Sequence, residues 1–299
     1  MAGAVRRTTA LIGITAAALA LAACSRGNSP AKANGAAAVS MVPQRILRAP
    51  GNLVSVTQPQ ANGSMWMLAG KSSMGLFEMD SSTGHLTGSV SVSGAARSVA
   101  ETSTGVIGLA LGTDRTGALE LLSSTGKVFK TVPLPAPARE VVVGSDGTTF
   151  YVLSGTATTS SVTIVGSRAG RILDSVPMPS DAVSVVPDIP QTSLYALERN
   201  GLVDQVAITG KKVEVKFRAA TRGDTGQSIA LSPDGRTLYV LKNAGAVSNI
   251  AEVDINGEAV HKVLPAPSHC VQVLVSSSGG QLYDVVGTAG YGNVQVFAA

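Results

Sequence analysis

The chain has 299 residues, and Lys, Arg, Asp and Glu make up only 14% of them, against about 25% in an average domain. The formal net charge is +4, which is too small to predict the strong basic patch that nucleic-acid binding requires. Only two cysteines are present, Cys24 and Cys270, so a disulfide framework is excluded.

The first 23 residues have the order of an export signal. Arg6 and Arg7 precede an apolar run from Ala10 to Ala20, and small residues follow before Cys24. The run is shorter than the about 20 residues that span a bilayer comfortably, so residues 1–23 are predicted to be a cleaved signal peptide. Arg6-Arg7 also permits twin-arginine export, but the residues that follow match that pattern weakly, and the general route is favoured. Without Arg6 and Arg7, 21 basic side chains face 19 acidic ones.

The end of this segment, Leu21-Ala22-Ala23-Cys24, resembles the lipobox of bacterial lipoproteins. In such proteins the cysteine receives a diacylglycerol group and becomes the mature N-terminus. The resemblance implies lipidation of Cys24 and attachment to the extracytoplasmic face of the cell membrane. Acyl chains anchor a protein because each buried methylene contributes about 0.8 kcal/mol. The alternative is an ordinary signal peptide with a chance cysteine.

The segment 24–40 is rich in Ala, Gly, Ser and Asn without periodicity, and it is predicted to be a flexible tether. Residues 41–299 are predicted to form a single folded domain.

Two markers recur along this domain. Four of the five tyrosines, Tyr151, Tyr195, Tyr239 and Tyr283, are 44 residues apart, and each ends a turn that leads into an apolar strand. Glycines between pairs of apolar strands recur at steps of 42, 44, 40 and 47, namely Gly84, Gly126, Gly170, Gly210 and Gly257. Each is expected to supply the positive φ of a hairpin turn. An internal period of about 40–50 residues built from strands predicts a β-propeller.

The markers divide the domain into four-stranded units. They span Asn52–Arg97, Ser98–Arg139, Glu140–Ala182, Val183–Gln227 and Ser228–Cys270, and a sixth unit starts at Val271. The sixth lacks an outer strand, whereas Gln44–Pro50 resembles the outer strand His261–Pro267. We therefore predict an all-β propeller of six blades in which the N-terminal strand completes the last blade and hides its open edges. Trp66 and Ile107 stand near the tyrosine position in the first two units, so five or seven blades are the alternatives.

The segment Ser232-Pro233-Asp234-Gly235-Arg236-Thr237-Leu238-Tyr239-Val240 resembles the core of the YVTN β-propeller repeat. Gly144–Leu153 matches it in part and the other units match loosely. The resemblance implies the propeller fold over Asn52–Ala299. Members of that family are often seven-bladed, and their functions vary, so the resemblance implies no particular activity.

Residues that could act in catalysis or metal binding are scattered along the sequence. Asp146 and Asp234 each precede glycine in a hairpin, where aspartate usually bonds its own backbone. The histidines, His85, His261 and His269, fall in different units, whereas a metal site needs three or four converging ligands. His269-Cys270 is the best local pair, and Cys270 is most simply a buried hydrophobe. We expect neither a metal nor a cofactor.

The inner strands carry polar residues at comparable positions, namely Ser98, Glu140, Ser184, Ser228 and Gln272. This set is rich in hydroxyls and poor in carboxylates, which disfavours a tight calcium site of the kind found in propeller lactonases. Nucleophilic catalysis also needs a base beside a serine or cysteine, and no such motif is present in the sequence.

In a propeller, the interblade loops and the loops between second and third strands lie on one face. The charged side chains predicted there are Arg97, Arg139, Asp114, Arg115, Arg199, Arg222, Asp224 and His269. Arg97 and Arg139 occupy matching positions before an inner strand, so we hypothesise that this mouth prefers an anionic ligand. The alternative is that these are solvated loop charges.

The sequence thus favours a non-catalytic, membrane-anchored lipoprotein whose propeller presents one face to a protein, glycan or small molecule. A propeller hydrolase or lactonase, or a quinone-cofactor enzyme, is the alternative. A third possibility is a structural component of an envelope complex held through an outer strand, which exposed apolar patches on the blade edges would favour.

Overall fold

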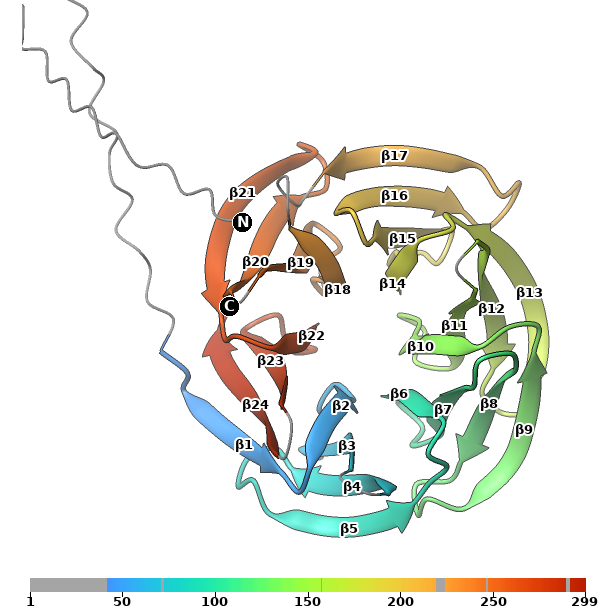
Figure 1. The fold of residues 1–299 in the computed structure, drawn as a ribbon, viewed down its shortest axis with the longest axis vertical. Helices are drawn as coiled ribbons and strands as arrows, with labels where there is room; N and C mark the ends of the chain where they lie inside the picture. Colours follow the sequence, from blue (N-terminus) through green and yellow to red (C-terminus); the bar gives the residue numbers. More distant parts are fainter. Residues whose placement is uncertain (1–41, 71–72, 157, 219–223, 246, 289–290) are drawn as a thin grey trace, which may run out of the picture. The chain divides into compact units, whose positions relative to one another are not determined.

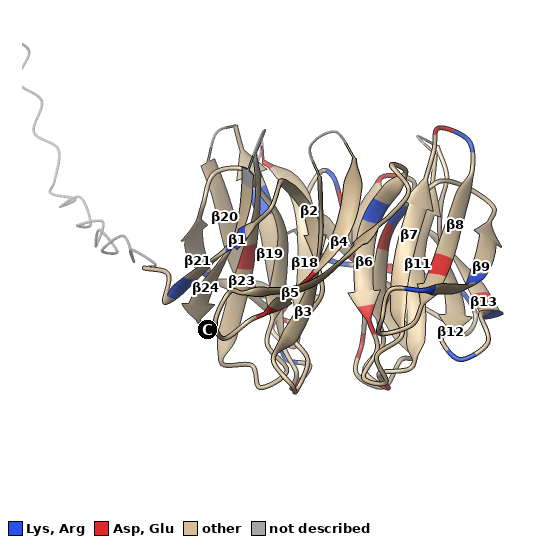
Figure 2. Cartoon of the chain, turned by 90° about the horizontal axis from the view of Figure 1, so that it is seen from below, with Lys and Arg blue, Asp and Glu red and all other residues tan. Residues whose placement is uncertain are grey.

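The computed structural model describes residues 42–70, 73–156, 158–218, 224–245, 247–288 and 291–299. The described part is all-β and contains six four-stranded antiparallel sheets. Figure 1 shows these sheets as blades around a central axis, and Figure 2 shows their strands running between two loop-bearing faces. The prediction of six blades is confirmed.

Five blades each use four consecutive strands, which run from the innermost strand to the outermost. Blade 1 consists of β2 (Asn52–Val56), β3 (Ser64–Gly70), β4 (Met74–Asp80) and β5 (Leu86–Ser91). Blade 2 consists of β6 (Ala96–Glu101), β7 (Ile107–Gly112), β8 (Gly117–Leu122) and β9 (Val128–Leu134). Blade 3 consists of β10 (Ala138–Val143), β11 (Thr149–Gly155), β12 (Ser160–Gly166) and β13 (Arg171–Met178). Blade 4 consists of β14 (Ala182–Pro187), β15 (Ser193–Glu198), β16 (Leu202–Ala207) and β17 (Val213–Arg218). Blade 5 consists of β18 (Thr225–Leu231), β19 (Thr237–Ala244), β20 (Val247–Asp254) and β21 (Ala259–Ala266).

Blade 6 joins the two ends of the domain. It contains β22 (Cys270–Val275), β23 (Gln281–Thr288) and β24 (Tyr291–Ala298), with β1 (Arg45–Ala49) as its outer strand. β1 pairs antiparallel with β24, and Leu47 lies opposite Val294. Leu47 is buried in the apolar cluster that joins blades 6 and 1. The predicted ring closure by the N-terminal strand is confirmed.

Blade 1 begins at Asn52 as predicted, and the other five blades begin one to three residues earlier than predicted. Inner strands start at Ala96, Ala138, Ala182, Thr225 and Cys270. Each inner strand carries a bulge near its start, for example between Ala96 and Ser98. The alternation of apolar residues in the sequence does not reveal these bulges. Arg97 and Arg139 therefore belong to inner strands, and their prediction as interblade-loop residues was wrong.

A left-handed residue closes each turn between the first and second strands of a blade. Glycine takes this position in five blades, at Gly63, Gly105, Gly147, Gly235 and Gly279, and Gln191 takes it in blade 4 with φ 56°. Between the third and fourth strands, Gly84, Gly126, Gly170 and Gly210 have positive φ as predicted. The prediction fails for Gly257, because Glu258 adopts the positive φ of 49° there.

Turn aspartates bond their own turns, as the sequence predicted. Asp146 accepts hydrogen bonds from the backbone N–H groups of Thr148 and Thr149, at 2.9 and 3.0 Å. Asp234 accepts from the Ser232 hydroxyl at 2.6 Å and from the Arg236 N–H at 3.1 Å. Hydrogen bonds of this kind lower the pKa of the Asp234 carboxyl.

Apolar clusters fill the seams between neighbouring blades. The four repeated tyrosines are buried in them, and Trp66 takes the same place in blade 1. In blade 2 the matching residue is Gly108 rather than Ile107, because Gly108 lies opposite Leu121 as Tyr151 lies opposite Ile164. A Cβ on Gly108 would lie 2.7 Å from the Phe150 ring. Gly108 has no side chain, and the Phe150 ring of blade 3 therefore occupies the space beside it.

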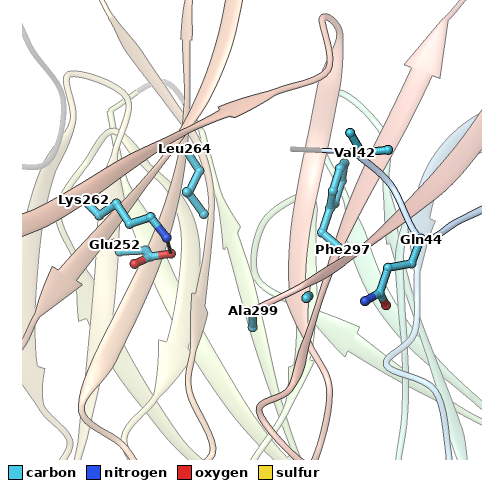
Figure 3. Close-up of a pocket in the computed structure, with 8 residues that line it drawn as sticks. Val42, Gln44, Glu252, Lys262, Leu264, Phe297 and Ala299 are labelled. Carbon is cyan, nitrogen blue, oxygen red and sulfur yellow. Dashed lines mark ion pairs between the residues drawn. The ribbon is translucent and has the colours of Figure 1, made fainter. Parts of the chain in front are cut away.

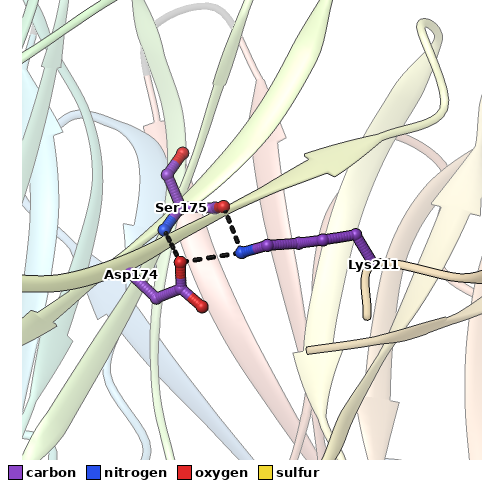
Figure 4. A network of polar contacts seen from close by, with 3 residues as sticks. All are labelled: Asp174, Ser175 and Lys211. Atoms are coloured by element: carbon purple, nitrogen blue, oxygen red, sulfur yellow. Dashed lines mark hydrogen bonds and ion pairs between the residues drawn. The ribbon is translucent and has the colours of Figure 1, made fainter. Parts of the chain in front are cut away.

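Polar contacts join the blades at their outer rim as well. In Figure 4, Lys211 of the turn before β17 reaches back to the outer strand of blade 3. Its Nζ lies 2.7 Å from Asp174 Oδ1 and donates to the Ser175 carbonyl at 2.6 Å. The hydrogen bond from Lys211 lowers the pKa of Asp174.

Candidate functional site

Each inner strand carries one polar side chain directly after its bulge. These residues are Ser55, Ser98, Glu140, Ser184, Ser228 and Gln272. All of them except Ser55 were predicted from the sequence as polar residues of the inner strands. The match between Val54-Ser55-Val56 and Val183-Ser184-Val185 would have revealed it.

Each of these side chains accepts a hydrogen bond from a backbone N–H on the inner strand of the next blade. The donor and acceptor pairs are Val99 to Ser55 at 3.3 Å, Val141 to Ser98 at 3.1 Å, Val185 to Glu140 at 2.7 Å, Ile229 to Ser184 at 3.2 Å, Val273 to Ser228 at 3.3 Å and Val56 to Gln272 at 2.9 Å. The last pair runs from blade 1 back to blade 6, so the circuit is closed. We call these six residues the interblade ring. Their polar atoms are engaged in holding the blades together.

Glu140 is the one carboxylate of the interblade ring. Its Oε1 accepts the Ser184 hydroxyl at 2.7 Å while its Oε2 accepts the Val185 N–H at 2.7 Å. Burial raises the pKa of Glu140 to about 7, although both hydrogen bonds oppose the shift. Glu140 thus changes its charge near neutral pH at the centre of the propeller.

Arg97 and Arg139, the two arginines predicted at matching positions of the ligand face, have different surroundings. Arg97 is exposed and makes no ion pair with any described residue. Arg139 is partly buried, and it donates to the Ala182 carbonyl at 3.1 Å and to the Thr156 carbonyl at 2.6 Å. Burial and the charge of Arg199 lower the pKa of Arg139. Arg139 therefore links blades 3 and 4, whereas Arg97 is free for a ligand.

Three other predicted residues lie on loops of this face. Asp114 and Arg115 are exposed between β7 and β8. Arg199 is exposed between β15 and β16, and its N–H donates to the Asp181 carbonyl at 3.1 Å. The charges of Arg139 and Arg199 are close enough to repel each other.

The remaining residues of the predicted ligand face are Asp224, His269 and Arg222. Asp224 forms an ion pair with Lys242 at 3.0 Å, with side-chain exposures of only 9% and 7%, so its carboxylate is engaged within the fold. His269 lies between β21 and β22 in a left-handed conformation with φ 63°. Arg222 lies outside the described residues, as does Cys24.

The fold brings two carboxyl groups together on this face. Glu198 ends β15 and interacts with the buried Asp204 of β16. Burial raises the pKa of both groups, and the nearby charge of Asp181 adds to the effect. Asn200 Nδ2 donates to Glu198 at 2.8 Å. Neither carboxyl belongs to a recognisable motif, so only the fold brings the pair to light.

The outer strands expose apolar side chains. Phe129, Leu173, Val215 and Val263 are between 49% and 62% exposed on β9, β13, β17 and β21. Prolines interrupt three of these edges, at Pro133, Pro177 and Pro265, which limits pairing with another strand. Contact with an envelope complex through an outer strand stays a prediction.

The described residues hold neither a metal cluster nor a membrane-spanning helix. No three His, Cys, Asp or Glu side chains gather there in a way that could hold a metal ion. The same part of the chain has no helix that is long and apolar enough to cross a bilayer.

Comparison with known proteins gives the fold. No family model and no curated protein sequence matches the chain. A chain of Kuenenia stuttgartiensis hydrazine synthase superposes with a TM-score of 0.66 at 12% identity, covering 83% of each chain. The β-propeller domain of Myceliophteria thermophila Cps50 (Swd1) superposes with a TM-score of 0.60 at 10% identity, covering 83% of this chain and 84% of that one. Likeness at this level of identity concerns the fold alone, and it agrees with the sheet topology: the chain is a six-bladed β-propeller.

Proposed function

We propose that this protein is an extracytoplasmic lipoprotein, anchored to the cell membrane through Cys24, whose propeller is a non-catalytic binding scaffold. The interblade ring supports this proposal, because these six polar side chains of the inner strands serve to hold the blades together. We also propose a relationship to the YVTN repeat family, on the residues of the Ser232–Val240 turn and strand.

Substitution of Cys24 tests the anchor. In a bacterial host, Cys24→Ala is expected to abolish incorporation of a labelled fatty acid and to move the protein from the membrane to the soluble fraction, because the substitution removes the acyl acceptor. Cys270→Ala is the matched control, since Cys270 is buried, and it should leave both readouts unchanged. A Cys24→Ala protein that still carries the label would refute the assignment.

The ligand of the scaffold is proposed to be anionic and to contact Arg97. With Arg139 tied to two backbone carbonyls, Arg97 is the arginine that tests the idea cleanly. We expect Arg97→Ala to weaken binding of inorganic phosphate, followed by NMR titration, by about threefold, as one exposed charge contributes modestly. Arg171→Ala, an exposed arginine at the start of β13, is the control. Equal weakening by both variants would mean that net charge alone attracts the anion.

A further inference from the structure

A polar cavity of about 510 Å³ opens on blade 5, at the end that carries its two hairpin turns. Tyr239, Glu252, Asp254 and His261 line it, with Asp234 from the turn between β18 and β19. Both Glu252 and Asp234 lie near enough to the Tyr239 ring to raise the pKa of its hydroxyl, together with burial. The cavity therefore presents carboxylates around a phenol that belongs to the seam between blades 5 and 6.

A second cavity of about 290 Å³ continues along the same seam. Glu252 borders both cavities. Figure 3 shows Glu252, Lys262 and Leu264 on the blade 5 side, facing Val42 and Phe297 on the blade 6 side. Leu264, Val42 and Phe297 make this part of the wall apolar. We call the two cavities together the seam groove.

One turn residue distinguishes this seam from the seam between blades 3 and 4. In the seam between blades 3 and 4, the Tyr151 hydroxyl donates to Gln191 Oε1 at 2.8 Å. Gln191 is the left-handed residue of its turn, and Gly279 holds that position in blade 6 with φ 75°. Glycine has no side chain to reach Tyr239. No described residue accepts or donates a hydrogen bond to the Tyr239 hydroxyl, so it is available to a ligand.

The charges of the seam groove favour a cation. Carboxylates of Asp234, Glu252 and Asp254 outnumber the cationic groups of Arg236 and Lys262. Lys262 Nζ lies 3.7 Å from Glu252 Oε1, which is beyond a normal hydrogen bond. Apart from this ion pair, none of the described side chains donates a hydrogen bond to the Glu252 carboxylate, so its oxygens can accept hydrogen bonds from an ammonium or guanidinium group.

We propose that the seam groove binds an extended peptide segment of a partner protein, with a lysine or arginine side chain on Glu252 and Tyr239. An apolar side chain of the same segment packs against Leu264 and Phe297. A peptide fits because the two cavities meet at Glu252 and offer a polar and an apolar pocket in succession. This site lies at the opposite end of the blades from Arg97 and is independent of the anionic ligand proposed there.

The test uses a fluorescein-labelled hexapeptide of alternating leucine and lysine, and a second peptide in which glutamate replaces lysine. Fluorescence anisotropy with the lipid-free full chain, carrying Cys24→Ser, is expected to show saturable binding of the basic peptide. Glu252→Gln should weaken this binding about tenfold, the equivalent of one charge-assisted hydrogen bond. Glu78→Gln is the matched control, because Glu78 lies opposite Trp66 as Glu252 lies opposite Tyr239. It should leave the affinity unchanged.

A second variant fills the seam groove with a side chain instead of removing the charge of Glu252. Gly279→Gln places at blade 6 the residue that caps Tyr151 in the seam between blades 3 and 4. We expect it to weaken the basic peptide at least as much as Glu252→Gln does, in protein whose thermal transition stays cooperative. Tight binding of the acidic peptide overturns the proposal, and so do equal effects of Glu252→Gln and Glu78→Gln on the basic peptide. If Gly279→Gln fails to fold, the comparison of Glu252→Gln with Glu78→Gln decides alone.

Discussion

Replacing Asp284 by valine is expected to raise the free energy of unfolding by about 2–4 kcal/mol at pH 8. Asp284 is fully buried in β23, and neither carboxylate oxygen has a hydrogen-bond partner among the described residues. Its counterparts, one residue after the tyrosine in blades 3 and 5, are Val152 and Val240. Valine therefore suits this position in two other blades, and it removes an unpaired charge from the core. Urea denaturation followed by circular dichroism measures the change.

The gain in unfolding free energy from Asp284→Val should increase with pH. Burial raises the pKa of Asp284 to about 7 from an ordinary value of 3.8. The folded state thus holds the proton more tightly than the unfolded state does. The contribution of this group to stability is complete below pH 3.8 and is lost as the pH rises through 7. We expect the advantage of Asp284→Val to grow over that interval.

Two controls separate charge from packing. Asp284→Asn keeps the shape, and it should remove the pH dependence of this group with a smaller gain in stability. Asp114→Asn alters an exposed carboxylate of a loop, and it should change stability by less than about 0.5 kcal/mol. A wild-type protein that is more stable than Asp284→Val at pH 8 would show that the carboxylate is paired.

Removing the Glu140 carboxyl is expected to lower the free energy of unfolding by about 2–4 kcal/mol at pH 6. Glu140→Ala leaves the Val185 N–H and the Ser184 hydroxyl without their acceptor. It therefore opens the interblade ring between blades 3 and 4. Because the folded pKa of Glu140 is raised to about 7 from 4.5, the stability that this group contributes is lost as the pH rises through 7. The cost of Glu140→Ala should accordingly shrink between pH 6 and 8.

The matched variant for this experiment is Glu140→Gln. Gln272 already accepts the Val56 N–H at 2.9 Å in blade 6, so glutamine is a working member of the interblade ring. Glu140→Gln should retain most of the stability at pH 6 and show no titration of this residue near pH 7. If the alanine and glutamine variants unfold at the same denaturant concentration, the interblade hydrogen bonds contribute little.

Much of the fold could be predicted from local patterns. The tyrosine and glycine periods predicted the blades, and the likeness of Gln44–Pro50 to His261–Pro267 predicted that the N-terminal strand closes the ring. The predicted starts of blades 2 to 6 were one to three residues late, since a bulge adds a residue without changing the apolar pattern. Gly108 was missed because the side chain that fills its place, Phe150, comes from another blade.

The candidate site could be predicted only in part. Asp114, Arg115 and Arg199 lie on exposed loops, as their neighbouring turn residues indicated. Arg139 and Asp224, however, are engaged with other parts of the fold. Their partners lie between 17 and 43 residues away, so no local pattern reveals them.

The sequence by itself determined the class of fold, the closure of the ring and the left-handed turns, because these depend on alternation and turn chemistry within one blade. The tertiary structure decided which side chains meet across a seam. The interblade ring, the uncapped Tyr239 and the unpaired Asp284 all arise there. The physical reason is that contacts between blades depend on the twist and spacing of two packed sheets, which the repeat period does not specify.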